Sequence, residues 1–295
     1  MTFRNTIASI MSLLLLCSCG GSTVQQQPAA DSTALVIKEL NTDSIDSDQY
    51  VLISTSMGDM TVKLYRDAPM HRKNFINLVM NGYYDGQIFY RVLPGELIQT
   101  GDYLSRISPD KPEMGKHDVD YTIGQEIDPA RRWHKRGALA AASMGSKGTY
   151  SSGAHFYIIA GGNVTNKVME QAEKEINSLA YDRAYIQQQL EHNDEIRRLH
   201  DNGKKEELNS LLRELKKAAR ASLGGVDFKY SSAQRRQYLN DGGTPQHDAD
   251  YTVFGEVIEG LEVVDSISRV DAYPNGLPRK HVVINKVTIL EDYVE

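Results

Sequence analysis

The 295-residue sequence has only two cysteines, Cys17 and Cys19, and no long apolar run. Beyond residue 19 the chain can form no disulfide bond and offers no thiolate ligand to a metal. The apolar segment at residues 7–16 is too short to span a bilayer comfortably. The fold must therefore rest on ordinary side-chain packing, and the sequence is long enough for one or two domains with a full core.

An excess of positive charge is also missing. The chain has 33 lysine and arginine residues against 39 aspartate and glutamate residues, which gives a formal net charge of −6. No block of basic residues occurs outside the charged middle of the chain. Because nucleic-acid binding depends on a basic surface, we expect no nucleic-acid partner.

The first 19 residues predict an export signal. Arg4 supplies a positive start, the apolar segment at residues 7–16 follows, and Leu16-Cys17-Ser18-Cys19 then resembles a bacterial lipobox. This resemblance implies that Cys19 carries lipid, and an ordinary signal peptide cut nearby is the alternative. Residues 20–48 are rich in Ser, Thr, Gln, Asp and Gly, which is typical of a flexible tether. The expected location is the bacterial cell envelope, with the protein anchored to a membrane through Cys19 and facing the periplasm.

The most distinctive stretch of the folded part is residues 89–102. β-forming residues flank Pro94-Gly95, which predicts two strands joined by a turn. Arg91 stands in the otherwise apolar first strand. Because a guanidinium keeps its charge, both a functional role and a surface ion pair are open to Arg91 at this point.

This stretch resembles the signature of the cyclophilin-type peptidyl-prolyl isomerases. That family has phenylalanine, histidine, arginine, two apolar residues and a turn, followed by an aromatic residue, an apolar pair, glutamine, two glycines and aspartate. The matching residues are Phe89, Arg91, Val92, Leu93, Leu97, Ile98, Gln99, Gly101 and Asp102. Tyr90, Glu96 and Thr100 depart from the pattern. Further family motifs follow in order up to residue 290, and one of them has His155 where glutamine is usual.

By resemblance, residues 49–295 form a mainly β domain, a closed, mainly antiparallel eight-stranded barrel with two capping helices. The strands expected from apolar alternation suit such a barrel. A helical insertion at residues 164–243 interrupts the family pattern. Apolar residues at steps of three and four predict two amphipathic helices that form an antiparallel hairpin. Ser231 and Gln234 predict a capping box at the start of a third, shorter helix.

Rotation about an X–Pro bond makes and breaks no bond, so we expect no cofactor and no metal. The barrier of roughly 18–20 kcal/mol comes from amide resonance. A site lowers it by binding the twisted amide better than either planar form, for which an apolar pocket and a fixed donor suffice. The resemblance implies Arg91 as that donor and Gln99 as the residue that holds the peptide beside it.

The resemblance also implies the residues of the peptide-binding groove. They are Leu97, Ala142, Phe156, Tyr157 and Tyr251, with Tyr157 at the floor of the proline pocket. Two departures place polar groups where the ring should be buried, because Glu96 replaces an aromatic wall and His247 replaces a leucine. We expect Glu96 to reach the pocket and pair with Arg91, and solvent exposure of Glu96 is the alternative.

The sequence therefore predicts a membrane-anchored peptidyl-prolyl cis-trans isomerase that acts on proline-containing exported proteins. The alternative, from another class, is a binding or chaperone module that has kept the barrel and lost much of the rate. The polar departures at Glu96 and His247 and the added surface of the insertion favour this alternative. A peptide isomerisation assay distinguishes the two.

Overall fold

The structure is a computed structural model that describes residues 48–110, 113–143, 150–291 and 293. The predictions for Cys19, the export signal and the tether up to residue 47 lie outside these residues. Within the described part, no helix combines the length and the hydrophobicity that crossing a membrane would require.

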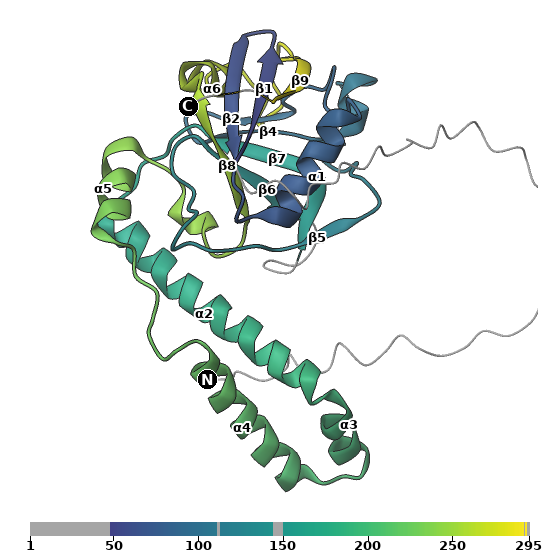
Figure 1. Cartoon of the computed structure of the whole chain (residues 1–295), viewed down its shortest axis with the longest axis vertical. Helices are drawn as coiled ribbons and strands as arrows, with labels where there is room; N and C mark the ends of the chain where they lie inside the picture. The colour runs from purple at the N-terminus through teal and green to yellow at the C-terminus, as the bar shows by residue number, and fades with distance from the viewer. Residues whose placement is uncertain (1–47, 111–112, 144–149, 292, 294–295) are drawn as a thin grey trace, which may run out of the picture. The chain divides into compact units, whose positions relative to one another are not determined.

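Nine antiparallel strands form one sheet in the order β3-β4-β7-β6-β8-β2-β1-β9, and β5 is added to β7 (Figure 1). The strands are β1 Gln49–Thr55, β2 Gly58–Leu64, β3 Arg91–Leu93, β4 Leu97–Thr100, β5 Thr122–Gly124, β6 Ala138–Ser143, β7 Tyr150–Ile159, β8 Val253–Glu259 and β9 Ile284–Leu290. The path ends at β3 and β9. An isolated bridge between Ile88 and Val283, with backbone hydrogen bonds between residues 86–89 and 282–284, joins the segments at the start of these two strands. The fold is mainly β and the sheet is antiparallel, as predicted. Complete closure of the sheet into a barrel is not confirmed.

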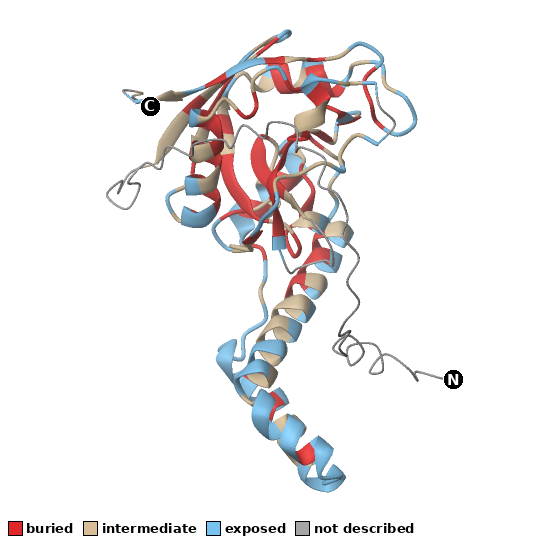
Figure 2. Cartoon of the chain, turned by 90° about the vertical axis from the view of Figure 1, so that its right-hand side faces the viewer, coloured by how far each residue is buried: buried red, intermediate tan, exposed pale blue. Residues whose placement is uncertain are grey.

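The main core lies between the sheet and two helices, α1 (Pro69–Met80) and α6 (Leu261–Ser268). Pro69 begins α1 at a position where a backbone N–H has no acceptor within the helix, so the N–H that proline lacks costs no hydrogen bond. Phe75 of α1 packs edge-on against Phe156 of β7, with ring centroids 5.3 Å apart. Figure 2 shows that buried residues concentrate on the sheet and on the helices that cover it.

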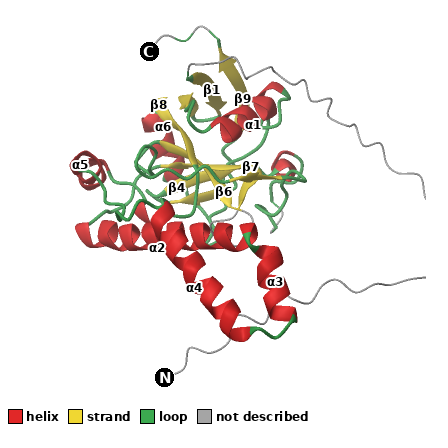
Figure 3. Cartoon of the chain, turned by 60° about the horizontal axis from the view of Figure 1, so that its bottom comes forward, coloured by secondary structure: helices red, strands yellow, loops and turns green. Residues whose placement is uncertain are grey.

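Between β7 and β8 the chain forms four helices and a short 3₁₀ turn. They are α2 Asn166–Glu191, α3 Asn193–Asp201, α4 Lys205–Ser222, α5 Ser232–Asp241 and η3 Pro245–His247; a further 3₁₀ turn, η2, spans Tyr103–Arg106. α4 packs against α2, and α3 links their far ends (Figure 3). The predicted first helix is divided at His192, whose ring nitrogen Nδ1 lies 2.9 Å from the carbonyl oxygen of Gln188. The capping box at Ser231 and Gln234 is confirmed.

The near ends of α2 and α5 form a second buried cluster beside the sheet. Its apolar members are Met169, Ala172, Ile176, Tyr230, Tyr238 and Ala249. The buried carboxylate of Glu173 accepts hydrogen bonds from the Tyr230 amide at 3.0 Å, from Lys229 at 2.8 Å and from Arg235. These contacts tie α2 to the segment that leads into α5, so the near end of the helical region is packed into the domain.

Candidate functional site

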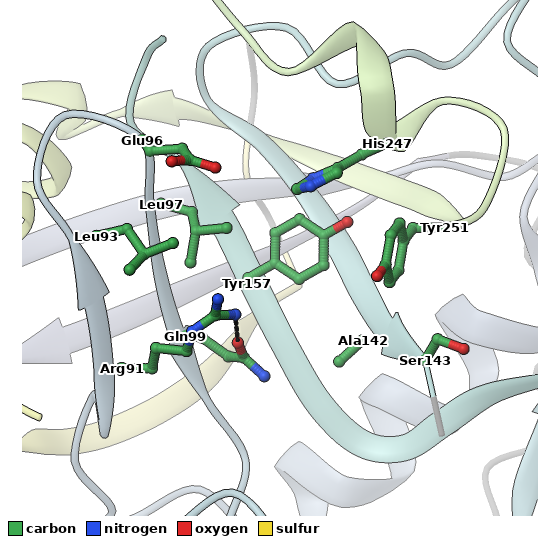
Figure 4. Close-up of a pocket in the computed structure, with 10 residues that line it drawn as sticks. All are labelled: Arg91, Leu93, Glu96, Leu97, Gln99, Ala142, Ser143, Tyr157, His247 and Tyr251. Carbon is green, nitrogen blue, oxygen red and sulfur yellow. Dashed lines mark hydrogen bonds between the residues drawn. The ribbon is translucent and has the colours of Figure 1, made fainter. Parts of the chain in front are cut away.

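A pocket opens where β3, β4, β6 and β7 meet the segment that precedes β8 (Figure 4). Eight of the nine residues predicted for the site line it: Arg91, Glu96, Leu97, Gln99, Ala142, Tyr157, His247 and Tyr251. Leu93 and Ser143, which were not predicted for the site, line it as well. Residues up to 160 positions apart in the chain (91 to 251) therefore share one pocket.

Phe156 does not line this pocket, and the prediction that it does is corrected. Its side chain is 1% exposed and belongs to the main core, where it contacts Phe75 and Tyr84 edge-on. Successive side chains of a strand point to opposite faces. Because Tyr157 faces the pocket, its neighbour Phe156 must face the core.

Arg91 and Gln99 are direct partners in the antiparallel pairing of β3 with β4. Residues directly opposite each other in two paired strands have their side chains on the same face of the sheet, and Arg91 Nη1 donates to Gln99 Oε1 at 3.0 Å. Arg91 is exposed and Gln99 is half-buried. The guanidinium therefore lies at the rim of the pocket, held from one side and open to a ligand on the other.

Behind Gln99, two departures from the family pattern contact each other. Tyr90 Oη lies 2.8 Å from His155 Nδ1, and His155 Nε2 lies 3.0 Å from the carbonyl oxygen of His117. A carbonyl only accepts, so Nε2 carries the proton and Nδ1 accepts from the Tyr90 hydroxyl. The Tyr90 oxygen then accepts from Gln99 Nε2 at 2.6 Å. This order of donors leaves Gln99 Oε1 to accept from Arg91.

The Tyr90 hydroxyl stays protonated at physiological pH. Burial, reinforced by the charge of Asp102, raises the pKa of Tyr90 well above its usual value. Its proton is therefore available to His155 throughout the range in which the protein works. The sequence shows Tyr90 and His155 as separate departures, and nothing in their spacing indicates that they meet.

The floor of the pocket is an aromatic cluster around Tyr157. The Tyr157 ring centroid lies 5.8 Å from that of His247 and 5.8 Å from that of Tyr251, both edge-on. Beneath the floor, His134 Nε2 lies 3.0 Å from the Tyr157 hydroxyl. Burial, with the nearby Tyr251 and Asp248, holds the pKa of Tyr157 well above its usual value. The hydroxyl that replaces an apolar ring edge is thus neutral and hydrogen-bonded, which removes most of the cost of burying it.

Glu96 reaches the pocket, as predicted, but the predicted ion pair with Arg91 is not formed among the described residues. Glu96 is half-buried in the turn between β3 and β4, and its amide donates to the carbonyl oxygen of Leu93 at 3.0 Å. Figure 4 shows Leu97 between Glu96 and the guanidinium, which is directed at Gln99. The carboxylate therefore gives one wall of the pocket a negative charge without occupying the arginine.

The arrangement offers a ring-sized aromatic floor beside one fixed cation. Such a site can bind an uncharged ring and donate hydrogen bonds to an amide next to it. In the described part of the chain, no three His, Cys, Asp or Glu side chains are grouped to hold a metal ion.

Residues 50–289 match the model of the family described as cyclophilin-type peptidyl-prolyl cis-trans isomerase. A Staphylococcus haemolyticus protein provisionally named as a peptidyl-prolyl cis-trans isomerase is 26% identical over 252 residues, which cover 85% of this chain and 96% of that protein. A Streptococcus pyogenes protein provisionally named as a bifunctional phosphatase and peptidyl-prolyl cis-trans isomerase is 26% identical over 270 residues. The match covers 89% of this chain, which spans 44% of the length of that relative. Among solved structures, a Cryptosporidium parvum cyclophilin-type isomerase matches 84% of this chain and 100% of its own, with a TM-score of 0.48 and 20% identity.

Proposed function

The chain belongs to the cyclophilin-type peptidyl-prolyl cis-trans isomerases, and we propose that it isomerises X–Pro bonds at the pocket bounded by Arg91 and Tyr157. The observation that carries this proposal is the Arg91–Gln99 hydrogen bond of 3.0 Å at the rim of a pocket with an aromatic floor. A prolyl ring packed on this floor would have its own amide next to the Arg91 guanidinium, which is always charged.

The proposed catalysis is non-covalent. The prolyl ring packs on Tyr157 and Leu97, and the Arg91 guanidinium donates to the substrate amide as that amide twists out of its plane. Twisting makes the prolyl nitrogen pyramidal and more basic, so the hydrogen bond strengthens in the transition state and lowers the barrier. Gln99 holds the guanidinium in place before the substrate arrives, so little reorganisation is needed during the rotation.

The polar lining sets the expected rate. Glu96 and His247 stand at positions where an apolar wall would exclude water more completely. Water retained near the substrate amide weakens the hydrogen bond from Arg91, because hydrogen bonds are stronger in a site of low dielectric constant. We therefore propose a working but moderate isomerase.

The proposed substrates are exported proteins that contain proline. Support comes from the predicted export signal and the lipobox-like sequence that ends in Cys19. A lipid on Cys19 would hold the domain at the membrane of the cell envelope, on the periplasmic side, where newly exported chains fold.

A second candidate function is a weak isomerase that mainly binds unfolded chains. Two exposed apolar side chains on the far part of α2 favour it, Ile186 at 54% and Leu190 at 65% exposure. A protease-coupled assay with a short Ala-Pro peptide separates the candidates. The leading proposal requires a rate above the uncatalysed one that Arg91→Ala removes. A rate equal to the uncatalysed one on several X–Pro peptides would support the weak binding module.

A further inference from the structure

The buried carboxylate of Asp248 joins the helical region to the floor of the pocket. It is 2% exposed, and its Oδ2 accepts hydrogen bonds from the hydroxyls of Tyr230 and Tyr238, each at 2.6 Å. Its Oδ1 accepts from the backbone amide and the Nδ1 of His134, each at 2.7 Å. Four donors from three separate segments therefore converge on one carboxylate.

The direction of this network is fixed by its chemistry. An ionised carboxylate only accepts, so the Nδ1 of His134 must carry a proton. In the neutral imidazole, Nε2 then accepts, and the Tyr157 hydroxyl donates to it across 3.0 Å. Burial, with the charge of Asp248, raises the pKa values of Tyr230 and Tyr238 well above the usual value, so both remain donors. The Tyr157 hydroxyl is thus held in one orientation by a series of hydrogen bonds that starts at Tyr230 and Tyr238 in the helical region.

A second contact runs through the η3 turn. His247 of this turn lies in the pocket lining, and Asp248 follows it directly. The helix α2 packs against η3, and the Tyr230 hydroxyl lies 3.4 Å from the carbonyl oxygen of Pro245. Tyr230 therefore contacts η3 directly, and both tyrosines hold Asp248, which is the neighbour of the wall residue His247 and supports the floor residue Tyr157 through His134.

We infer that the near end of the helical region is part of the active site, with Tyr230 and Tyr238 acting as positioning residues for Tyr157 and His247 through Asp248 and His134. The inference rests on the proposed function of the pocket. Loss of the two hydroxyls would leave a buried carboxylate with two donors in place of four, a loss that the surrounding structure can relieve only by moving Asp248 or admitting water. Either change displaces His134 and with it the floor on which the prolyl ring packs.

The test is the double variant Tyr230→Phe/Tyr238→Phe in the full chain, which keeps both rings and removes both hydroxyls. Line-shape NMR on a short Ala-Pro peptide gives kcat and KM separately. We expect kcat/KM to fall about tenfold, because small displacements of a binding surface cost this much or more. The loss should fall mainly on KM, since the floor binds the ring equally in the ground and transition states.

The matched control is Tyr181→Phe/Tyr185→Phe. These two tyrosines lie on α2 and stack on each other, with ring centroids 6.2 Å apart, and Lys216 and Arg220 of α4 lie over their rings. The control also loses two tyrosine hydroxyl groups from the helical region, and we expect its kcat and KM to be unchanged. A second control deletes residues 184–224 and closes the gap with a short Gly-Ser linker, which keeps Glu173, Tyr230 and Tyr238. It should also retain full activity on the short peptide.

A readout independent of turnover keeps the inference separate from the proposed function. In protein labelled with ¹³C at the tyrosine ring, the Tyr157 signal is assigned by its absence from Tyr157→Phe. Tyr230→Phe/Tyr238→Phe should shift this signal and Tyr181→Phe/Tyr185→Phe should not. If the parent neither binds nor isomerises prolyl peptides, the proposed function fails, and the Tyr157 shift still decides the positioning role. An unmoved Tyr157 signal in a folded double variant, or a loss of activity equal to that of the control, overturns the inference.

Discussion

The hydroxyl oxygen of Tyr90 lies 2.8 Å from Nδ1 of His155, and this contact determines which atom of Gln99 faces Arg91. Without Tyr90 the Gln99 amide would lose the acceptor that holds its NH₂ group, and without His155 the Tyr90 proton would be free to donate to the Gln99 amide oxygen. The amide could then turn and present a donor to a guanidinium, which can only donate. The orientation of the proposed catalytic residue is therefore set by a pair of side chains beneath the pocket.

We predict that Tyr90→Phe lowers kcat/KM about tenfold, because Gln99 Nε2 and His155 Nδ1 both lose their partner. A buried polar group left without a partner costs about 1–3 kcal/mol, so the free energy of unfolding should fall as well. Tyr90→His with His155→Gln restores the residue pair of the family pattern. This double variant should be more active than either single change, and a double-mutant cycle in the peptide assay measures the coupling. Strictly additive effects would contradict a direct Tyr90–His155 dependence.

Arg91→Ala should lower kcat/KM about 100-fold, the loss typical of removing one transition-state donor. Because Arg91 is exposed, the thermal midpoint should change little. Arg91→Lys is the sharper comparison. A lysine keeps the charge but lacks the planar fork, so we expect it to recover only a small part of the rate. Full activity in Arg91→Lys would show that charge alone is sufficient.

Glu96→Phe should raise kcat/KM about tenfold, which corresponds to about 1.4 kcal/mol in the barrier. The reason is the restored apolar wall, since the structure shows no ion pair from Glu96 to Arg91 among the described residues. Glu96→Gln serves as the control because it removes the charge and keeps a polar wall. Its gain should be clearly smaller than that of Glu96→Phe. Equal gains would assign the effect to charge instead of to water in the pocket.

Stability should fall in acid partly through Glu173. Burial acts to raise the pKa of this carboxyl, but hydrogen bonds from Lys229 and the Tyr230 amide, with the charge of Arg235, outweigh it and lower the pKa below 4.5. The folded state therefore binds the proton less tightly than the unfolded state. The stabilisation is complete above about pH 4.5 and is lost as the pH falls through the lower folded-state pKa.

Urea unfolding between pH 3 and neutral pH measures this contribution. Glu173→Gln should lower the free energy of unfolding by about 2 kcal/mol at neutral pH, the scale of hydrogen bonds to a charged group. It should also flatten the loss of stability below pH 4.5 relative to the parent. If the stability of Glu173→Gln falls in acid as steeply as that of the parent, the titrating group is not Glu173.

The proposed lipid anchor at Cys19 makes a separate prediction. Cys19→Ser should move the protein from the membrane fraction to the soluble fraction, because the modified thiol would be gone. Immunoblots of the two fractions and the mass of the purified protein check this. Retention of the variant in the membrane fraction, with a mass that differs only by the substitution, would falsify the anchor.

The local chemistry of the site could be predicted from sequence where it depends on short stretches. The turn at Pro94-Gly95 places Arg91 opposite Gln99, and both residues of this pair lie at the pocket. The alternation of β7 also predicts that Phe156 and Tyr157 face opposite ways, so resemblance alone misplaced Phe156. Family similarity gave the residue type at each position, whereas the strand period decides the face.

Contacts between distant segments could not be predicted in this way. His134 and Asp248 are 114 positions apart, and no local pattern marks either of them as a support for Tyr157. The division of the helical region at His192 was equally hidden, because no glycine or proline marks it. Closure of the sheet depends on how β3 and β9 approach each other, which strand periodicity does not encode.

The side chain of Asn177, midway along α2, lies in the stretch where this helix leaves the domain and continues along α4. Its amide donates to the carbonyl oxygen of Phe228 at 3.1 Å and accepts from the Phe228 amide at 2.7 Å. Before this pair α2 is packed into the domain. Beyond it Leu179 still packs against the buried cluster and Arg183 donates to the carbonyl oxygen of Ala249, while later turns of the helix pack on α4. Backbone amides of a single continuous helix should therefore exchange with solvent in two classes. The slow class should end near Arg183, and the faster class reports local opening of α3, α4 and the far turns of α2, which can separate while the pocket stays intact.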